Sequence, residues 1–239
     1  MNYDPHIVWQ YLFSGQLIEG AWLTLELALL AQAMGVVLGV ASALARQSHS
    51  LLIRGPAEFY VWFFRGTPVL VQLYFWFAGF PQIFPGLHID FFGDALLALG
   101  INEGAYMTEI VRAGLDAVDP GQREAATSLG MGYGLAMRRV ILPQAARVII
   151  PPTGNEFISM LKTTSLAAVV SVEELLHRTQ AIYQENFYVL ELLTVASIYY
   201  LLMTTVFSVL QAQLERRMGE RNADRGPSLR RRLIGLGEP

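Results

Sequence analysis

The chain has no cysteine among its 239 residues, and Asp, Glu, Lys and Arg together make up only 15% of it. The absence of cysteine excludes a disulfide framework, a zinc–thiolate site and a cysteine nucleophile. A soluble domain of this size carries about 25% charged residues. Since 53% of the residues are hydrophobic, the chain is expected to lie mostly in lipid.

Lysine is almost absent as well. The single lysine, Lys162, follows Leu161, whereas a phosphate-binding P-loop needs Gly-Lys followed by Ser or Thr. The chain therefore contains no P-loop, and any ATP-driven step must use another chain. The four histidines are scattered without ligand spacing, so we predict no metal site. No catalytic constellation is visible either, so we expect no cofactor and no enzymatic activity. Residues 1–16 lack a basic start and an apolar core, so no cleaved signal peptide is expected.

Five apolar segments are long enough to cross a membrane, which takes roughly 20 residues. They are residues 17–45, 58–80, 94–115, 149–170 and 187–210. The third and fourth segments carry glutamates, and charge that faces lipid is costly, so these faces should point into the bundle or a wet cavity. The sequence predicts an all-α integral membrane protein with five transmembrane helices.

The arginine distribution sets the orientation, because cytoplasmic loops are enriched in Lys and Arg. With the N-terminus outside, all but two of the 17 Lys and Arg residues lie on or near the cytoplasmic side. We therefore predict an extracytoplasmic segment 1–16, a transmembrane domain 17–215 and a basic cytoplasmic tail 216–239. The outer connection 171–186 is expected to include a short helix.

A polar stretch, residues 116–145, separates the third and fourth segments on the cytoplasmic side. Residues 119–121, Asp-Pro-Gly, are typical of a helix start, and the glycines at 130, 132 and 134 should end that first short helix. Residues 135–142 should form a second one, stopped by Pro143. The alanines at 125 and 126 keep one face small, so that another surface can approach. On spacing alone, the stretch fits either a knob gripped by a soluble partner or an amphipathic linker on the membrane.

This stretch resembles the signature of the permease subunits of ATP-binding-cassette importers. The signature is Glu-Ala-Ala, three residues, Gly, nine residues, Ile, one residue, Leu-Pro. The residues that stand at these positions here are Glu124, Ala125, Ala126, Gly130, Val140, Leu142 and Pro143. Val140 replaces the usual isoleucine and keeps a β-branched apolar side chain. In that family the loop is the coupling helix that docks on the ATPase subunit.

Three further motifs are similar to those of polar amino acid permeases, and they occur in the same order. They are residues 64–68 with 71–73, residues 104–110 with 112–114, and residues 151–158 with 162–166. The resemblance implies a bacterial inner-membrane, multi-pass permease that transports a polar or basic amino acid. It also implies several partners: separate ATPase subunits docked at 119–143, a second permease subunit, identical or related, and an extracytoplasmic binding protein.

Candidate substrate contacts come from spans four and three. We rank Glu156 first for an ammonium group and Asn155 next, with Thr153 beside them, since the prolines at 151 and 152 free backbone carbonyls nearby. Tyr106 and Glu109 follow on span three, where they share a face with the residue at 102.

Structural alternatives stay open for these residues. Glu109 is also spaced to pair with Arg112, and Glu156 with Lys162 or Arg65. We expect residues 65–68 to bend span two rather than bind substrate. Glycine pairs at 35 and 39 and at 100 and 104 predict helix packing within the subunit or across a dimer. The aromatic residues between 60 and 77 are expected to face lipid.

Two other function classes fit the sequence less well. A gradient-driven secondary transporter or channel commonly shows internal repeats, and no motif occurs twice here. A membrane-bound enzyme or assembly anchor remains the third reading, although the sequence contains no catalytic constellation that would support an enzyme.

Overall fold

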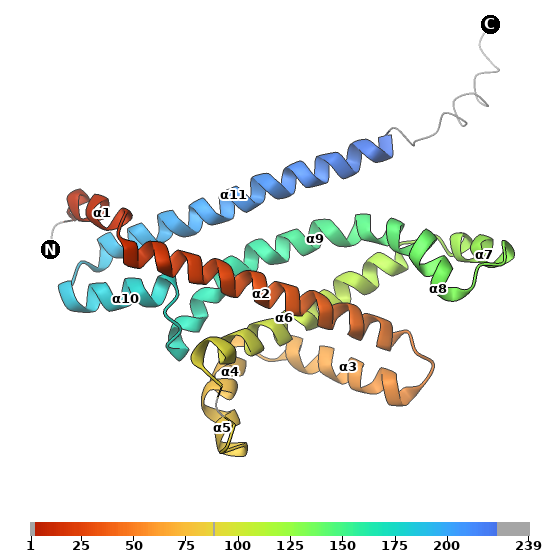
Figure 1. Ribbon diagram of the computed structural model, residues 1–239, viewed down its shortest axis with the longest axis horizontal. Coiled ribbons are helices and arrows are strands. Elements are labelled where there is room, and N and C mark those ends of the chain that lie inside the picture. Colours follow the sequence, from red (N-terminus) through yellow and green to blue (C-terminus); the bar gives the residue numbers. More distant parts are fainter. Residues whose placement is uncertain (1–2, 88, 224–239) are drawn as a thin grey trace, which may run out of the picture.

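The computed structural model describes residues 3–87 and 89–223, and these fold entirely into helices, turns and short connections (Figure 1). The elements, in chain order, are α1 (Pro5–Leu12), α2 (Gly15–Arg46), α3 (Leu51–Gly66), α4 (Val69–Tyr74), the π-helical turn η1 (Phe75–Gly79), α5 (Phe80–Ile83), α6 (Phe91–Asp116), α7 (Pro120–Ser128), α8 (Tyr133–Ala136), the π-helical turn η2 (Met137–Ile141), α9 (Leu142–Thr163), the 3₁₀ helix η3 (Thr164–Val170), α10 (Leu175–Asn186) and α11 (Val189–Ala223). The predicted all-α class is confirmed, and most of the predicted tail, residues 224–239, lies outside the described residues.

Two of these helices are long and apolar enough to cross a membrane by length and composition. Within residues 3–87 and 89–223 they are α2 and the Val189–Met218 part of α11. A shorter apolar run covers Val69–Ile83. The predicted connection 171–186 does contain a helix, α10, and residues before the first span form α1, which is capped by the side chain of Asp4.

The second predicted segment, residues 58–80, is not one continuous helix. α3 ends at Gly66, the backbone is extended at Thr67, and α4 starts after Pro68. Pro68 lacks the N–H that would bond the carbonyl of Phe64 in a continuing helix. Side-chain amides replace it, since Gln72 Nε2 and Asn102 Nδ2 donate to Phe64 O at 3.1 and 2.9 Å. The expected bend at residues 65–68 is confirmed.

Pro143 does not stop a helix, contrary to the sequence prediction. Helical backbone runs without a gap from α8 through η2 into α9, and Pro143 lies in the first turn of α9. In η2 the N–H of Leu142 bonds the carbonyl of Met137, five residues earlier. The backbone hydrogen bonds thus widen to the π spacing just before the proline, and this local widening lets the helix continue past Pro143, which has no N–H.

Four of the eight aromatic side chains between residues 60 and 77 are exposed, as expected for positions that face lipid, whereas Trp76 and Phe77 are partly buried against the core. Trp62 is among the most exposed, at 70%. Tyr60 is an exception, because its hydroxyl donates to the carbonyl of Ile101 at 2.6 Å and packs against α6. The prediction that it faces lipid is wrong.

The most extensive helix contact in the described structure joins α2 to α6. Small residues of α2 make the close approach possible. A Cβ atom added at Gly39 would collide with Met107 Cβ and lie 2.8 Å from the Met107 carbonyl carbon, and one at Gly35 would lie 2.8 Å from Glu103 Cβ. The glycine pairs at 35 and 39 and at 100 and 104 thus serve packing within the subunit.

One end of the bundle is formed by α1 and α10, while α7 and α8 lie at the opposite end (Figure 1). At the α10 end the buried carboxylate of Glu174 caps α10 and accepts hydrogen bonds from His177 N at 2.8 Å, Tyr200 Oη at 2.8 Å and Thr24 Oγ1 at 3.2 Å. Burial raises the pKa of Glu174 above its ordinary value, and the hydrogen bonds oppose the rise. This cap ties α10 to α2 and α11.

Replacing Gly39 by alanine tests the α2–α6 contact. Overpacking costs about 1–3 kcal/mol, so Gly39→Ala should lower the thermal unfolding midpoint of the purified protein, followed by tryptophan fluorescence. Gly55→Ala on α3 is the matched control, because nothing lies within 4 Å of its added Cβ. That control should be neutral or stabilising by up to about 1 kcal/mol through helix propensity. Equal midpoints for the two variants would contradict a packing role for Gly39.

Candidate functional site

A cavity of about 420 Å³ lies between the α3–α4 break, α6 and α9. Its lining combines charged, polar and apolar side chains. The lining residues are Arg65, Gly66, Thr67, Pro68, Val69, Leu99, Asn102, Glu103, Tyr106, Glu156, Ser159, Met160 and Thr163. The break between α3 and α4 borders this space, because Thr67 and Pro68, which form the break, are among the lining residues.

Two carboxylates face the cavity from different helices. Glu103 of α6 is buried, and Gln32 Nε2 of α2 donates to its Oε1 at 3.1 Å. Glu156 of α9 is half-buried, and it makes no ion pair with the other residues that the structure describes. Glu156, Ser159 and Thr163 follow the helical spacing of three and four residues, so α9 presents one polar face to the cavity.

The cation of the cavity is Arg65, the penultimate residue of α3. Its Cζ lies 5.2 Å from the centre of the Tyr106 ring, within the range of a cation–π contact. Its Nη1 is 3.7 Å from Glu109 Oε1. An anion-binding group thus sits in the same cavity as two groups that attract cations.

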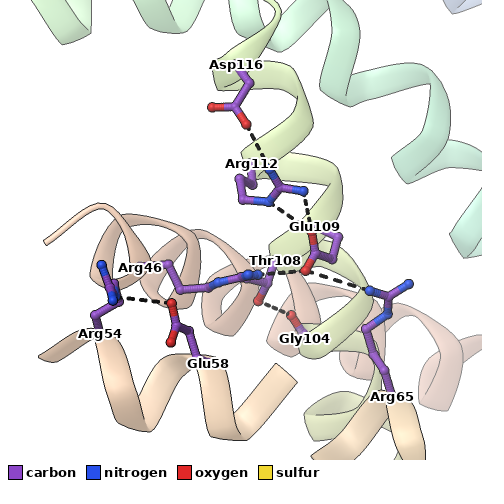
Figure 2. A network of polar contacts seen from close by, with 9 residues as sticks. All are labelled: Arg46, Arg54, Glu58, Arg65, Gly104, Thr108, Glu109, Arg112 and Asp116. Carbon is purple, nitrogen blue, oxygen red and sulfur yellow. Dashed lines mark hydrogen bonds and ion pairs between the residues drawn. The ribbon is translucent and has the colours of Figure 1, made fainter. Parts of the chain in front are cut away.

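Next to the cavity, Glu109 joins arginines of three helices, as Figure 2 shows. Arg46 Nη1 of α2 lies 2.6 Å from Glu109 Oε1, and Arg112 Nε and Nη2 of α6 both lie 2.9 Å from Oε2. Arg112 also pairs with Asp116 at 2.9 Å. The Glu109 side chain is 23% exposed. The pairing of Glu109 with Arg112 expected from the sequence is present, and Arg46 and Arg65 extend it into a cluster.

The structure brings together only part of the predicted substrate set. Glu156 and Tyr106 line the cavity, whereas Glu109 lies outside it in the arginine cluster. Asn155 faces α11, where Gln211 Nε2 lies 3.1 Å from its Oδ1. Thr153 donates to the carbonyl of Ile149 in its own helix at 2.8 Å.

Several lining residues were not among the predicted contacts. They are Arg65, Asn102, Glu103, Ser159 and Thr163. A signal existed for Ser159 and Thr163, because they share the helical face of Glu156. Glu103 also had a signal, because a glutamate in an apolar segment is expected to face the bundle or a wet cavity, but its partner Gln32, 71 positions away along the chain, could not be predicted.

The predicted coupling residues gather on α7, η2 and the start of α9. Glu124, Ala125 and Pro143 are exposed, and Leu142 is 43% exposed. Gly130 has a positive φ of 76°, which permits the tight connection between α7 and α8. Ala126, however, is buried against the chain itself.

The same end exposes three large apolar side chains. Leu129, Tyr133 and Leu135 are 77%, 64% and 49% exposed. They surround the α7–α8 connection, far from α1 and α10 (Figure 1). Apolar side chains gathered among polar ones on an exposed surface mark a site of interaction with another surface.

The sequence of this chain is similar to one protein family and to known members of transport systems. Residues 35–220 match the family model described as binding-protein-dependent transport system inner membrane component. An arginine transport system permease protein, ArgU, of Corynebacterium glutamicum is 45% identical over 86% of this chain and 69% of its own length. A glutamine transport system permease protein, GlnP, of Escherichia coli is 38% identical over 91% of this chain and 99% of its own.

Solved structures of transporters contain chains that are similar to this one. A crystal structure of an amino acid ABC transporter with histidines has a chain that superposes with a TM-score of 0.83 at 40% identity, covering 91% of this chain and all of that one. A chain of the MetNI methionine ABC transporter superposes with a TM-score of 0.71 at 18% identity, over 85% of this chain and 96% of that one, and therefore shares the fold.

The Glu109 carboxylate and the three arginines that pair with it, Arg46, Arg65 and Arg112, form the Glu109 cluster. Removing the charge of this shared carboxylate should lower the stability of the protein. Glu109→Gln leaves Arg46 and Arg112 without their carboxylate, at a cost of about 2 kcal/mol. Glu58→Gln is the control, since Glu58 forms an exposed pair with Arg54 at 3.2 Å that contributes about 0–1 kcal/mol. Thermal unfolding of the two variants should separate them by several degrees, and an unchanged midpoint for Glu109→Gln would argue against a stabilising cluster.

Proposed function

The chain belongs to the family of binding-protein-dependent transport system inner membrane components, and on that premise we propose that the cavity between α3, α6 and α9 holds the transported amino acid. The role of the chain is that of the membrane-spanning translocation subunit of an amino acid ATP-binding-cassette importer. The observation that carries the proposal is the joint presence of Arg65, Glu103 and Glu156 around one cavity.

The cavity has the chemistry that an amino acid requires. An amino acid carries an ammonium and a carboxylate, and burying either without an opposite charge is costly. Glu156 is free to accept an ammonium or a basic side chain, while Glu103 adds a second acidic side chain. Two carboxylates against one guanidinium favour a zwitterionic or basic amino acid over an acidic one. The arginine and glutamine permeases among the relatives fit this substrate class.

The membrane topology in the proposal has five spans, with the N-terminus outside and the C-terminus inside. The spans are α2, the broken segment α3–α5, α6, α9 with η3, and α11. The arrangement in Figure 1 supports it, because α1 and α10 share one end while α7 and α8 lie at the other. The one arginine of α10, Arg178, pairs with Glu19 at 2.7 Å and with Glu173 at 3.4 Å, so it adds little positive charge on the outer side.

The α7–α8 end is the proposed contact with the separate ATPase subunits. Leu129, Tyr133 and Leu135 provide an apolar surface there, and Glu124 and Ala125 of the signature lie next to it. Ala126 is buried within the chain, so in this proposal it packs beneath the surface and does not contact the ATPase. Since the chain has no P-loop, the free energy of ATP hydrolysis must enter through such a contact. A second permease subunit and an extracytoplasmic binding protein at the α1–α10 end complete the proposed assembly in the bacterial inner membrane.

A substitution at Glu156 tests the cavity. In proteoliposomes that contain the chain, its ATPase and the binding protein, Glu156→Gln should lower the initial rate of amino acid uptake about tenfold or more, because a charge-assisted contact is lost. Asn155→Ala is the control on the neighbouring residue, which faces α11 instead of the cavity. Equal losses for both variants would contradict a substrate role specific to Glu156.

The same proteoliposomes separate the proposal from a gradient-driven transporter. Uptake should stop when ATP or the ATPase subunit is omitted. Uptake by this chain alone, driven by an ion gradient, would disprove the importer function.

A charge placed on the apolar surface tests the ATPase contact. Leu129→Glu should abolish co-purification of the ATPase subunit with the tagged chain while membrane insertion is retained, because a carboxylate buried in an interface without a partner is costly. Leu87→Glu is the control, at a leucine that is 54% exposed in the connection between α5 and α6. Full retention of the ATPase by the Leu129→Glu variant would contradict docking at this surface.

A further inference from the structure

We propose that Arg65 binds the carboxylate of the transported amino acid, and that it does so by leaving Glu109. This inference rests on the proposed function of the cavity and extends it to one residue. It also departs from the expectation that residues 65–68 only bend span two.

Arg65 is the most loosely held of the three arginines around Glu109. Arg46 and Arg112 each contact a different carboxylate oxygen, at 2.6 and 2.9 Å, and so occupy both oxygens. Arg65 remains at 3.7 Å, beyond hydrogen-bond distance. Its side chain is 43% exposed, and its guanidinium donates no hydrogen bond to the rest of the described chain apart from this longer ion pair. A guanidinium has five N–H donors, so Arg65 has donors to offer a ligand.

The position of Arg65 suits an exchange between two carboxylates. It belongs to the cavity lining and to the Glu109 cluster at once, and Figure 2 shows its side chain reaching toward Glu109 from the end of α3. The Tyr106 ring, which also lines the cavity, lies against its guanidinium. Arginine presents a planar fork that binds a carboxylate through two parallel hydrogen bonds. A substrate carboxylate would therefore replace a long, shared contact with a short bidentate one.

The break between α3 and α4 fixes the backbone from which Arg65 projects. α3 ends one residue after Arg65 because of Pro68, and the freed carbonyl of Phe64 is bonded by Gln72 and Asn102. The break thus holds the Arg65 backbone beside the cavity, while its guanidinium is held only by the Tyr106 ring and the 3.7 Å ion pair with Glu109. Glu156 faces the cavity from α9, so the two ends of an amino acid meet opposite charges on different helices.

The proposal predicts that Arg65 recognises the carboxylate and nothing else of the ligand. The test uses the complex of the chain with its ATPase in lipid nanodiscs, without the binding protein, whose own selectivity would mask the effect. Equilibrium binding is measured for two pairs of probes, L-arginine with its decarboxylated amine agmatine, and L-glutamine with its decarboxylated amine 4-aminobutanamide. The wild-type complex should prefer the amino acid in the pair that it binds, by about 10- to 100-fold.

Arg65→Gln should lower the affinity for the amino acid by about the same factor and leave the affinity for its amine unchanged or higher. Arg65→Lys keeps the charge but loses the fork, so its affinity for the amino acid should lie between the two. Arg112→Gln is the control that loosens the Glu109 cluster without touching the cavity lining, and it should keep the wild-type preference. Retention of the ATPase in each purified complex verifies that the variants are assembled.

The outcomes separate the two proposals. If Arg65→Gln weakens amino acid and amine equally, or if Arg112→Gln loses the preference to the same extent, Arg65 acts only through the structure and this inference is overturned. If the wild-type complex binds amino acid and amine with equal affinity, the inference is also overturned while the cavity keeps its proposed role. If it binds neither member of either pair, the proposed function of the cavity fails, and the inference fails with it.

Discussion

The close approach of α2 and α6 is the constraint on which the rest of the structure depends. Gly35 and Gly39 carry no side chain on α2, so Glu103 and Met107 and the adjoining backbone of α6 come directly against the α2 backbone. This contact fixes the rotation of α6, and α6 in turn carries Asn102, Glu103 and Tyr106 to the cavity. A membrane supplies no hydrophobic driving force between helices, so close packing of small residues must replace it. The same contact holds Gln32 within reach of the buried Glu103 carboxylate.

The cavity arises from the second constraint, a helix that proline interrupts. In lipid each freed carbonyl has to find a donor, and here the donors are side-chain amides from α4 and α6. The interruption therefore binds three helices together while it opens space at the end of α3. A polar cavity and a stable bundle come from one local break in the backbone, and the arginine beside that break gives the cavity its positive charge.

Much of the fold could be predicted from the sequence, because apolar runs, arginine asymmetry and breakers are local signals. The helical class, the bend near Pro68, the helix in the connection 171–186 and the packing role of the glycine pairs were of this kind. The course of the chain at Pro143 could not be, since it depends on a π-helical turn that no residue pattern specifies. The candidate site was predicted in part: Glu156 and Tyr106 line the cavity. Asn155 lies on the side of α9 that faces α11, where Gln211 Nε2 is 3.1 Å from its Oδ1, and the packing of such a distant helix could not be predicted from local patterns.

The unbroken helical path from α8 through η2 and α9 into η3 has a thermodynamic consequence. It carries backbone that begins in the surface proposed to meet the ATPase and continues past Glu156. Two sites that are coupled through such an element affect each other equally. If a given state of the ATPase changes the affinity of the cavity for the amino acid by some factor, the bound amino acid changes the affinity of the chain for that ATPase state by the same factor. Any signal through α9 would therefore have no preferred direction at equilibrium, and only the consumption of ATP would make the cycle run one way.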